Sequence, residues 1–417
     1  MLVRLALGFL VELLRVKVLV PVQRRLLGHE LRSEPYSRAE QLRLALEQLG
    51  ATAIKLGQIL STRGDLVPPE YQTELVKLQD AAPSEPFRAI NRTISAELGR
   101  PVEKLFARFE RIPVSAASIG QAHSAILPDG AEVIVKVRRP GVVEQVELDL
   151  DIIGRTATSV SRYSATARRY DLVGLTREFA DTLRAELDYR REAANADRFA
   201  ANFAGDDSVR IPRVYHGTST SRVLTLERLH GLKIDDLEGL DAAGIDRVRL
   251  ANRAATVALK MILDDGFFHA DPHPGNFFIE PTGRIGLIDF GMVGTVDAGT
   301  RRSLSGLVSG LAGGGSEPLT AALVDLGVTP PGFDRRELDD DIERLLGAYL
   351  GRPLGELVLG PLLNDLLGVV RRHRLRLPTN LALLTKTLAM CEGVAAQLDP
   401  SFRMSEAIVE FLGHEVP

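Results

Sequence analysis

HADPHPGNFFI at residues 269–279, followed by LIDFG at residues 287–291, is the stretch that decides which fold we expect. It supplies hard oxygen ligands from Asp271, Asn276 and Asp289, set between short apolar segments. Magnesium ions in proteins prefer such oxygens and are often bound together with nucleotide phosphates. In one type of phosphoryl-transfer site, the first Asp faces the reacting group while the Asn and the second Asp hold the metal. The stretch therefore predicts a site for ATP and Mg2+, with Asp271 as the catalytic carboxylate and Asn276 and Asp289 as metal ligands.

The composition is that of an ordinary globular protein. The chain has 417 residues, of which 45% are hydrophobic and 25% charged, and this length predicts two or more packed subregions. The net charge of −4 provides no basic field that would attract nucleic acid. The single cysteine, Cys391, excludes an intramolecular disulfide framework and a cysteine-rich metal site, and we expect it to be an inert core residue.

The sequence contains no uninterrupted apolar run of the ~18 to 20 residues that a spanning helix needs, so no transmembrane helix is expected. Residues 1–35 are predicted to contain an amphipathic helix with one polar stripe that includes Arg4, Glu12 and Arg15. A helix docked on the protein's own body is favoured over one lying on a membrane surface. We therefore expect a cytoplasmic protein, with peripheral membrane association as the alternative.

The pattern of apolar residues changes along the chain. Residues 36–110 read as a helical segment, with helices over Ser37–Leu60, from Pro69 onward, and up to Gly99. Period-two patterns then predict five strands and one long helix between them. The strands are expected at residues 112–116, 121–127, 132–138, 209–215 and 222–229, with a hairpin turn at 128–130, and the helix at 175–203.

The remainder of the chain reads as mostly helical, with one helix over residues 244–266 leading into the opening motif. This order predicts an α+β, two-lobed fold divided into an amphipathic segment at 1–35, a helical extension at 36–110, an N-lobe at 111–230 and a C-lobe at 231–417. The connector between the lobes should lie at residues 226–231. Backbone groups of Glu227 and Leu229 there are candidates to hydrogen-bond to the edge of an adenine ring.

Lys136 is the candidate phosphate-binding cation. Strand alternation places it on one face, with Val135 and Val137 on the other. A solvated lysine on an edge strand is the alternative, but its position before a helix and the phosphate motif favours a functional role. The helix offers Glu192 and Glu186 as carboxylate partners.

The competing interpretation of this helix is a solvated charged face. In that case Glu186 would pair with Arg190 and Asp188 with Arg191, and Glu192 would have no basic neighbour of its own.

Residues 116–121 lie between the first two predicted strands, where a phosphate-covering loop belongs. Alanines and a serine replace most of the glycines of such a loop, so we expect it to be stiff. The candidate nucleotide-binding residues are Ala116, Ala117, Ser118, Ile119, Gly120 and Gln121.

Three histidines are interpreted as structural. Pro272 and Pro274 disfavour a helix that would bring His269 and His273 together on a metal, so both are expected to brace the loop. His123 is expected to be structural as well.

The motifs taken together resemble those of the UbiB family of atypical, protein-kinase-like proteins, the AarF-type kinases linked to coenzyme Q biosynthesis. The resemblance covers roughly residues 40–400. Beyond the motifs above, it rests on KLGQ at residues 55–58, which alone would read as a helix C-terminus, on ELD at 186–188 with Glu192, and on LDP at 398–400.

The resemblance implies a protein-kinase-like fold in which Lys136 pairs with Glu192 and contacts phosphate. It implies that Lys55 and Gln58 belong to an extension that folds over the active site, where Lys55 meets Glu186. The implied activity is ATP binding with slow hydrolysis, linked to isoprenoid quinone biosynthesis or lipid transport at a membrane.

The sequence departs from ordinary protein kinases. His269-Ala270-Asp271 lacks the usual arginine, and no Ala-Pro-Glu follows Gly291. The C-terminal membrane spans of many bacterial relatives are not found here, which puts stable membrane residence in doubt. We therefore favour an ATPase or a small-molecule or lipid kinase that acts on a quinone-precursor lipid. A nucleotide-gated lipid-binding module and a genuine protein kinase are the alternatives.

Overall fold

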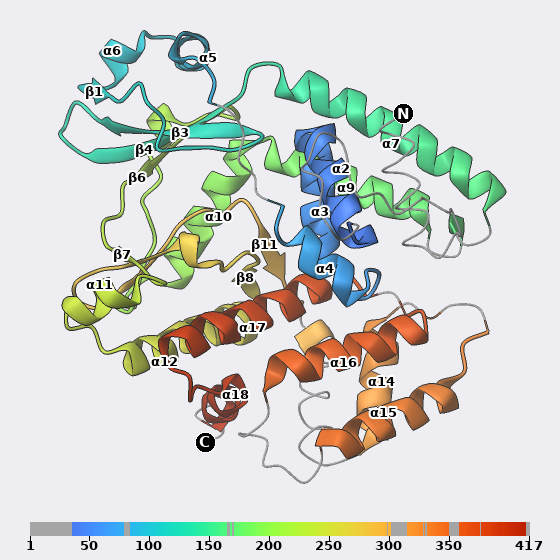
Figure 1. The fold of residues 1–417 in the computed structure, drawn as a ribbon. Coiled ribbons are helices and arrows are strands. Elements are labelled where there is room, and N and C mark those ends of the chain that lie inside the picture. Colours follow the sequence, from blue (N-terminus) through green and yellow to red (C-terminus); the bar gives the residue numbers. More distant parts are fainter. Residues whose placement is uncertain are drawn as a thin grey trace. The chain divides into compact units, whose positions relative to one another are not determined.

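The computed structural model describes residues 36–78, 84–164, 167–168, 171–297, 299–301, 315–327, 329, 332–349, 358–375 and 377–413. The expected amphipathic segment at residues 1–35 lies outside these ranges. The chain divides into two compact units, Met1–Ala193 with Val214–Arg228, and Ala194–Arg213 with Leu229–Pro417. Figure 1 labels the helices and strands of the chain.

The first unit begins with the helices α2 (Arg38–Leu49), α3 (Ala51–Thr62) and α4 (Pro69–Leu75). Ser37 caps α2 in a capping box with Glu40. The single helix predicted over Ser37–Leu60 is wrong, because Gly50 adopts a positive φ of 92° and separates α2 from α3. Buried leucines and a valine then pack the three helices together: Leu42, Leu46, Val67, Leu75 and Leu78.

An antiparallel sheet forms the middle of the first unit. Its strands are β1 (Arg108–Phe109), β2 (Ser115–Ala116), β3 (Gly120–Ile126), β4 (Glu132–Arg138) and β6 (Val223–Glu227), in the order β1-β3-β4-β6 with β2 also paired to β3. The predicted hairpin turn is confirmed by a hydrogen bond from the Gly130 amide to the Leu127 carbonyl. The helices α5 (Phe87–Leu98) and α6 (Val102–Leu105) cover one face of this sheet.

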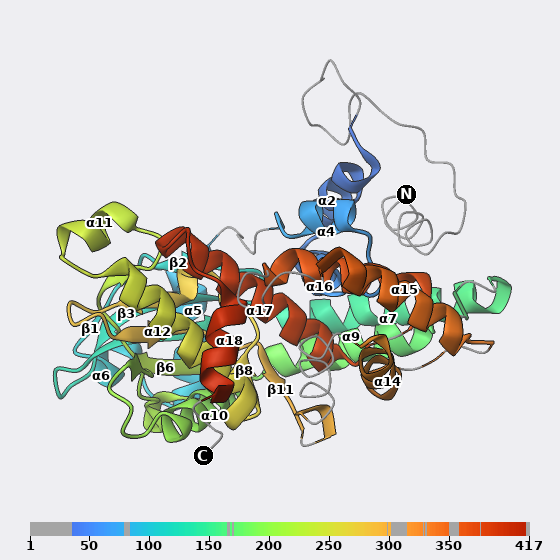
Figure 2. The same ribbon diagram turned by 90° about the horizontal axis from the view of Figure 1, so that it is seen from below.

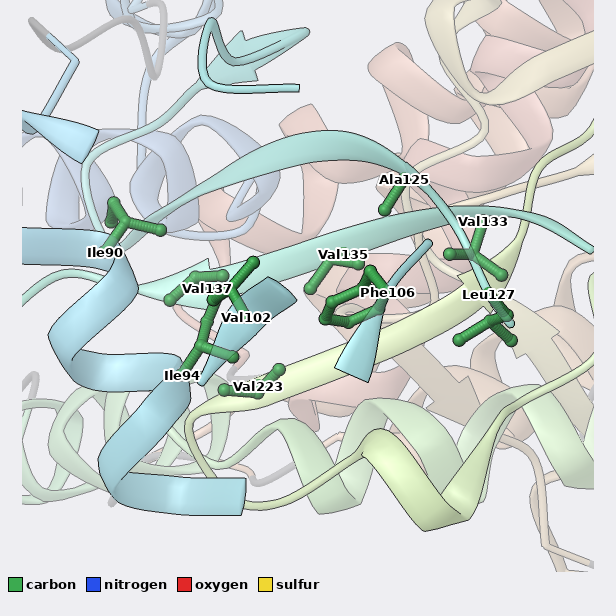
Figure 3. Close-up of a cluster of buried hydrophobic side chains, with 10 residues drawn as sticks. All are labelled: Ile90, Ile94, Val102, Phe106, Ala125, Leu127, Val133, Val135, Val137 and Val223. Atoms are coloured by element: carbon green, nitrogen blue, oxygen red, sulfur yellow. The ribbon is translucent and has the colours of Figure 1, made fainter. Parts of the chain in front are cut away.

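The core beneath α5 and α6 fixes which way β4 faces. Val133, Val135 and Val137 are fully buried against Phe106 and the two helices, as Figure 3 shows. Because successive side chains of a strand point to opposite faces, Lys136 lies on the other face of the sheet, as the alternation predicted.

Three helices lie between β4 and β6 in the sequence: α7 (Val142–Tyr163), α9 (Leu172–Glu186) and α10 (Tyr189–Asn202). The sequence did not predict α7, and the single helix predicted over residues 175–203 is wrong. Leu187 and Asp188 interrupt it, and Asp188 accepts a hydrogen bond from the Arg190 amide at the start of α10. Helices α7 and α9 lie side by side and share an apolar cluster (Figure 1).

The second unit contains a four-stranded sheet of order β5-β10-β9-β7 and the pair β8–β11. The apolar residues around the opening motif form several of these short strands. Their bounds are β5 Val209–Arg210, β7 Leu232–Lys233, β8 Phe267–His269, β9 Phe277–Ile279, β10 Ile285–Leu287 and β11 Val293–Thr295. The strand predicted at 209–215 is shorter than expected, since β5 ends at Arg210, and so is the one predicted at 222–229, which is β6 of the first unit.

The rest of the second unit, as far as the structure describes it, is mostly helical. Helix α12 (Arg247–Leu259) continues as a π-helical turn through Lys260–Asp264, which confirms a helix before the motif. Helices α17 (Thr379–Leu398) and α18 (Met404–Gly413) pack against α12 (Figure 2). The other α-helices described in this unit are α11 (Leu237–Ala242), α14 (Ser316–Leu326), α15 (Arg335–Tyr349) and α16 (Leu359–Arg372).

Among the helices that the structure describes, α17 is the one whose length and apolar composition would allow it to cross a membrane. Half of its apolar window, Asn380–Leu398, is buried within the protein. It also packs against α12 and α16, as the core helix of a globular unit does, so it is weak evidence for a span.

Candidate active site

The first unit holds a close ion pair between Lys136 and Glu192. Lys136 projects from β4, and Glu192 lies in the first turn of α10. The Lys136 Nζ lies 2.5 Å from the Glu192 Oε1, and the two side chains are 21% and 8% exposed. The predicted contact between this lysine and a carboxylate of the following helical segment is therefore present.

The other two carboxylates of this region have different partners. Glu186, at the end of α9, lies 2.5 Å from the Nζ of Lys55. Asp188 makes a bidentate pair with Arg190, which lowers the pKa of the Asp188 carboxyl through hydrogen bonding. The alternative of a solvated helix face with Glu186–Arg190 and Asp188–Arg191 pairs is wrong, because the break between α9 and α10 removes the required helical spacing.

KLGQ at residues 55–58 lies within α3 rather than at its end. Lys55 reaches Glu186, as the family resemblance implied. Gly57 is required for close packing, since a Cβ there would overlap Leu78 Cδ1 and lie 2.9 Å from Leu46 Cδ1. The side-chain amide of Gln58 donates to the Leu78 carbonyl at 3.2 Å, so it braces the helical hairpin.

The loop predicted to cover phosphate forms a tight turn between β2 and β3. Ala116 ends β2, and the Ala117 amide donates to the Gly120 carbonyl at 2.8 Å. Ser118 and Ile119, between them, are both buried. Gly120 has no room for a side chain, because a Cβ would overlap the Tyr189 hydroxyl and lie 2.8 Å from the Val137 carbonyl.

Gln121 and His123 lie on β3 and are bonded within the protein. The Gln121 Oε1 accepts from the Glu85 amide at 2.7 Å, and its Nε2 lies 2.8 Å from the His123 Nε2. The His123 Nδ1 is 2.8 Å from the Glu110 carbonyl, which can only accept, so Nδ1 carries a proton. Burial lowers the pKa of His123, and its predicted structural role is confirmed.

In the second unit, hydrogen bonds tie together the segments that carry Asp271, Asn276 and Asp289. The Asn276 Nδ2 donates to the Asp271 carbonyl at 3.0 Å, and the Asn276 carbonyl accepts from the Ile288 amide at 3.0 Å. Asp289 adopts a left-handed φ of 64°, and its Oδ1 accepts from the Gly291 amide at 3.3 Å. A non-glycine residue in this region of backbone space is uncommon and is often found at functional sites.

His269 braces this arrangement from within the core. Its Nε2 donates to the Ile288 carbonyl at 3.2 Å, and its Nδ1 accepts from the Asp271 amide at 3.2 Å. Burial lowers the pKa of His269, which keeps the ring neutral. The expectation that His269 and His273 are loop-bracing residues is confirmed. The exposed His273 accepts from the Gly275 amide through its Nδ1 at 3.0 Å, and its Nε2 lies 3.8 Å from the Asp271 Oδ2.

Three side chains that contact the segments around Asp271 and Asp289 were not predicted from the sequence. Lys386, on α17, places its Nζ 3.1 Å from the Asp271 Oδ1. Lys233, on β7, donates to the Gly275 carbonyl at 2.5 Å, and burial lowers its pKa. Asn195, on α10, donates to the Phe290 carbonyl at 2.9 Å. Each is distant in sequence from the group it contacts, and the one available signal was a lone lysine within the apolar helix α17.

Models of known protein families match most of the chain. Residues 77–319 match the ABC1 atypical kinase-like domain, and residues 342–403 match the UbiB helical domain. This chain belongs to the ABC1/UbiB family. The kinase-like fold expected from the sequence is thereby confirmed, and the predicted site residues Lys136, Glu192, Asp271, Asn276 and Asp289 all lie within the matched ABC1 domain.

Similar proteins support membership of the UbiB family. A protein of Xylella fastidiosa named probable protein kinase UbiB is 38% identical over 372 residues, 87% of this chain and 67% of that protein. ACTIVITY OF BC1 COMPLEX KINASE 7 of Arabidopsis thaliana is 38% identical over 368 residues, 87% of this chain and 52% of that protein. An uncharacterised protein of Synechocystis is 37% identical, and the chain spans 63% of its length.

A solved structure of Rv3197 from Mycobacterium tuberculosis, in complex with erythromycin, is also similar. It has a TM-score of 0.57 and 28% sequence identity, and the match covers 87% of this chain and 92% of that one.

The donor set of the UbiB-family site fits magnesium. The Asn276 amide is oriented by its hydrogen bond to the Asp271 carbonyl, and Asp289 supplies a carboxylate. Within the ranges that the structure describes, no group of three or more His, Cys, Asp or Glu residues would hold a metal by itself. One amide and one carboxylate match a Mg2+ ion that takes its other ligands from phosphates and water.

The connector predicted to read adenine lies where the chain passes from one unit to the other. Glu227 ends β6 opposite Val133, and the division between the units falls after Arg228. Leu229 is buried and belongs to the second unit. Recognition of adenine by the backbone of Glu227 and Leu229 stays a prediction.

Proposed function

We propose that this UbiB-family protein binds ATP with Mg2+ and acts as an ATPase or as a small-molecule or lipid kinase in isoprenoid quinone biosynthesis or lipid transport. The observation that carries the proposal is the 2.5 Å ion pair between Lys136 and Glu192. Such a pair holds the lysine where it can contact the α- and β-phosphates of a nucleotide. A purely structural pair is a poor alternative, because burying two charges brings little net stability.

The proposed roles are assigned residue by residue within each unit. In the first, Lys136 binds phosphate and the loop at residues 116–121 covers it. In the second, Asn276 and Asp289 would hold magnesium, which would neutralise phosphate charge. Asp271 orients the attacking oxygen and accepts its proton, while Lys386 fixes the direction of the Asp271 carboxylate through the contact at 3.1 Å.

The hairpin α3–α4 supports small acceptors over peptides. Lys55 and Glu186 anchor it, and the buried Arg63 adds a bidentate bond to Asp65 and lies 3.6 Å from Glu178 on α9. Burial alone would lower the pKa of Arg63, but the bonds to Asp65 and the charge of Glu178 raise it. A fixed hairpin of this kind, which in the family resemblance lies where a peptide would bind, favours water or a small acceptor.

Two alternatives remain distinct from this proposal. The Xylella fastidiosa relative is named a probable protein kinase, and a protein kinase would transfer labelled phosphate to a protein in a reaction that Asp271→Ala abolishes. Rv3197 was solved with erythromycin, which is neither a nucleotide nor a peptide. That complex favours a ligand-binding module as the second candidate, in which nucleotide controls the retention of a lipid without phosphate transfer.

The deciding experiment measures ATP binding and turnover with and without Mg2+, quinone-headgroup analogues and anionic liposomes. Asp289→Asn should weaken Mg2+-dependent ATP binding strongly, because it removes the charge of a metal ligand. Asp246→Asn is the matched control, since Asp246 caps α12 through the Arg249 amide and Asn is an equally good cap. Equal ATP affinity in the wild type and Asp289→Asn would refute the proposal.

A further inference from the structure

The turn at residues 117–119, in the loop proposed to cover phosphate, is held at both ends by one residue. Arg139, just after β4, donates from its Nε to the Ala117 carbonyl at 2.7 Å. Its backbone amide donates to the Ile119 carbonyl at 2.9 Å. Arg139 therefore fixes two carbonyl groups of a three-residue turn.

Glu85 holds Arg139 in this position. The Arg139 Nη1 lies 2.9 Å from the Glu85 Oε1, and the two side chains are 12% and 32% exposed. The Glu85 amide also donates to the side chain of Gln121, the second residue of β3, at 2.7 Å. Arg139, Glu85 and Gln121 thus form a chain of hydrogen bonds around the turn. A guanidinium has several donors in a fixed plane, so it can bond a carbonyl and a carboxylate at once.

The turn is anchored on its other side by an apolar side chain. Ile119 is buried and packs in one cluster with Val142 and Val146 of α7. Leu56 and Ile59 of α3 pack against the same cluster. The side chain of Ile119 and the guanidinium of Arg139 therefore restrain the turn from two directions.

We propose that Arg139 and Glu85 are positioning residues for nucleotide phosphate: they hold the turn at residues 117–119 in one conformation before ATP arrives. The proposal rests on the proposed function, because it assumes that this loop covers phosphate. A loop that is already ordered loses little conformational freedom on binding, whereas a released loop must be ordered at the expense of affinity. Because Arg139 and Glu85 order the loop that covers phosphate, they should affect the binding of the phosphates and not that of the nucleoside.

The test compares Arg139→Met with Arg139→Lys, Glu85→Gln and the control Arg184→Met. Arg184→Met removes a bidentate pair with Glu147 whose side chains are 49% and 44% exposed, elsewhere in the same unit. Equilibrium binding of Mg2+-ATP and of adenosine is measured for each variant. Hydrogen exchange of residues 115–121, followed by mass spectrometry on ligand-free protein, reports the order of the turn without any nucleotide.

Arg139→Met should lower ATP affinity about tenfold, the effect of one lost charge-assisted interaction, and leave adenosine affinity unchanged. It should also speed exchange in residues 115–121. Glu85→Gln keeps the bond from Arg139 to Ala117 and should lower ATP affinity about threefold. Arg139→Lys should fall between the wild type and Arg139→Met, and Arg184→Met should match the wild type.

The proposal is overturned if exchange in the turn is unchanged in both Arg139→Met and Glu85→Gln. It is also overturned if ATP and adenosine affinities fall in parallel with the melting temperature, which would indicate a structural role alone. Failure of the wild type to bind ATP with Mg2+ would instead refute the proposed function, and with it the role of Arg139 and Glu85 in phosphate binding. The exchange measurement would still decide whether Arg139 orders the turn.

Discussion

Removing one or both charges of the Lys136–Glu192 pair should separate its effect on stability from its effect on nucleotide binding. Lys136→Met takes away the ammonium group 2.5 Å from a carboxylate that is 8% exposed. Removing one partner of a buried pair costs about 3 to 5 kcal/mol. Because Lys136 itself is 21% exposed and water can reach it, we expect a loss of about 2 to 3 kcal/mol.

The double variant Lys136→Met/Glu192→Met should recover most of this loss. It removes both charges and fills their place with flexible apolar side chains, and such replacements are often neutral within about 1 kcal/mol. Mg2+-ATP binding should nevertheless be lost in the single and the double variant alike, since neither has the cation that contacts phosphate. The pair Arg184–Glu147 is the control: its double replacement should change stability by less than about 1 kcal/mol, because both side chains are largely exposed.

The assay is urea unfolding followed by circular dichroism, with ATP binding followed by a fluorescent nucleotide. Because the protein has two units, the midpoint of each transition is compared rather than one global free energy. A double variant as unstable as Lys136→Met would show that the pair is not the source of the loss. Recovery of ATP binding in the double variant would refute the role of Lys136 in binding phosphate.

Three further predictions concern packing, pH and turnover. Gly57→Val should destabilise the first unit by about 1 to 3 kcal/mol through overpacking against buried leucines, whereas Gly154→Ala, at an open position of α7, should stabilise it by about 0.5 to 1 kcal/mol. The stability of the second unit should fall as the pH drops below about 6.5, the ordinary pKa of histidine, because burial lowers the pKa of His269 and the unfolded chain binds the proton more readily. Lys386→Met should lower ATP turnover about tenfold or more by removing the cation 3.1 Å from Asp271, with ATP affinity changed less.

Each of these has a result that contradicts it. Urea midpoints that shift in the same direction for Gly57→Val and Gly154→Ala would show that α3 has room at Gly57. In the pH series, His269→Gln should flatten the fall in stability on the acid side, and an unchanged slope would exclude His269 as its source. For Lys386, a turnover equal to that of the wild type would exclude a part in orienting Asp271, whereas Lys386→Arg should retain more activity than Lys386→Met.

Local patterns predicted much of the fold because they depend on residues close together in the sequence. The alternation of Val133, Val135 and Val137 placed Lys136 on the opposite face of β4, and the structure confirms it. The sequence pattern did not show where helices are interrupted. Gly50 and Asp188 each end a run of helical periodicity that otherwise continues, since apolar spacing persists on both sides of the break.

The sequence by itself determined which chemical groups this protein can offer: the side-chain oxygens of Asp271, Asn276 and Asp289, the ammonium group of Lys136 and the motifs that place the chain in its family. Tertiary structure decided which side chains from distant parts of the chain contact these groups and the segments around them. Lys386 reaches Asp271, Asn195 holds the Phe290 carbonyl, and the side chain of Gln58 braces a hairpin. The physical reason is that such contacts join residues far apart in the chain, and their partners are chosen by how helices and strands pack rather than by spacing along the sequence.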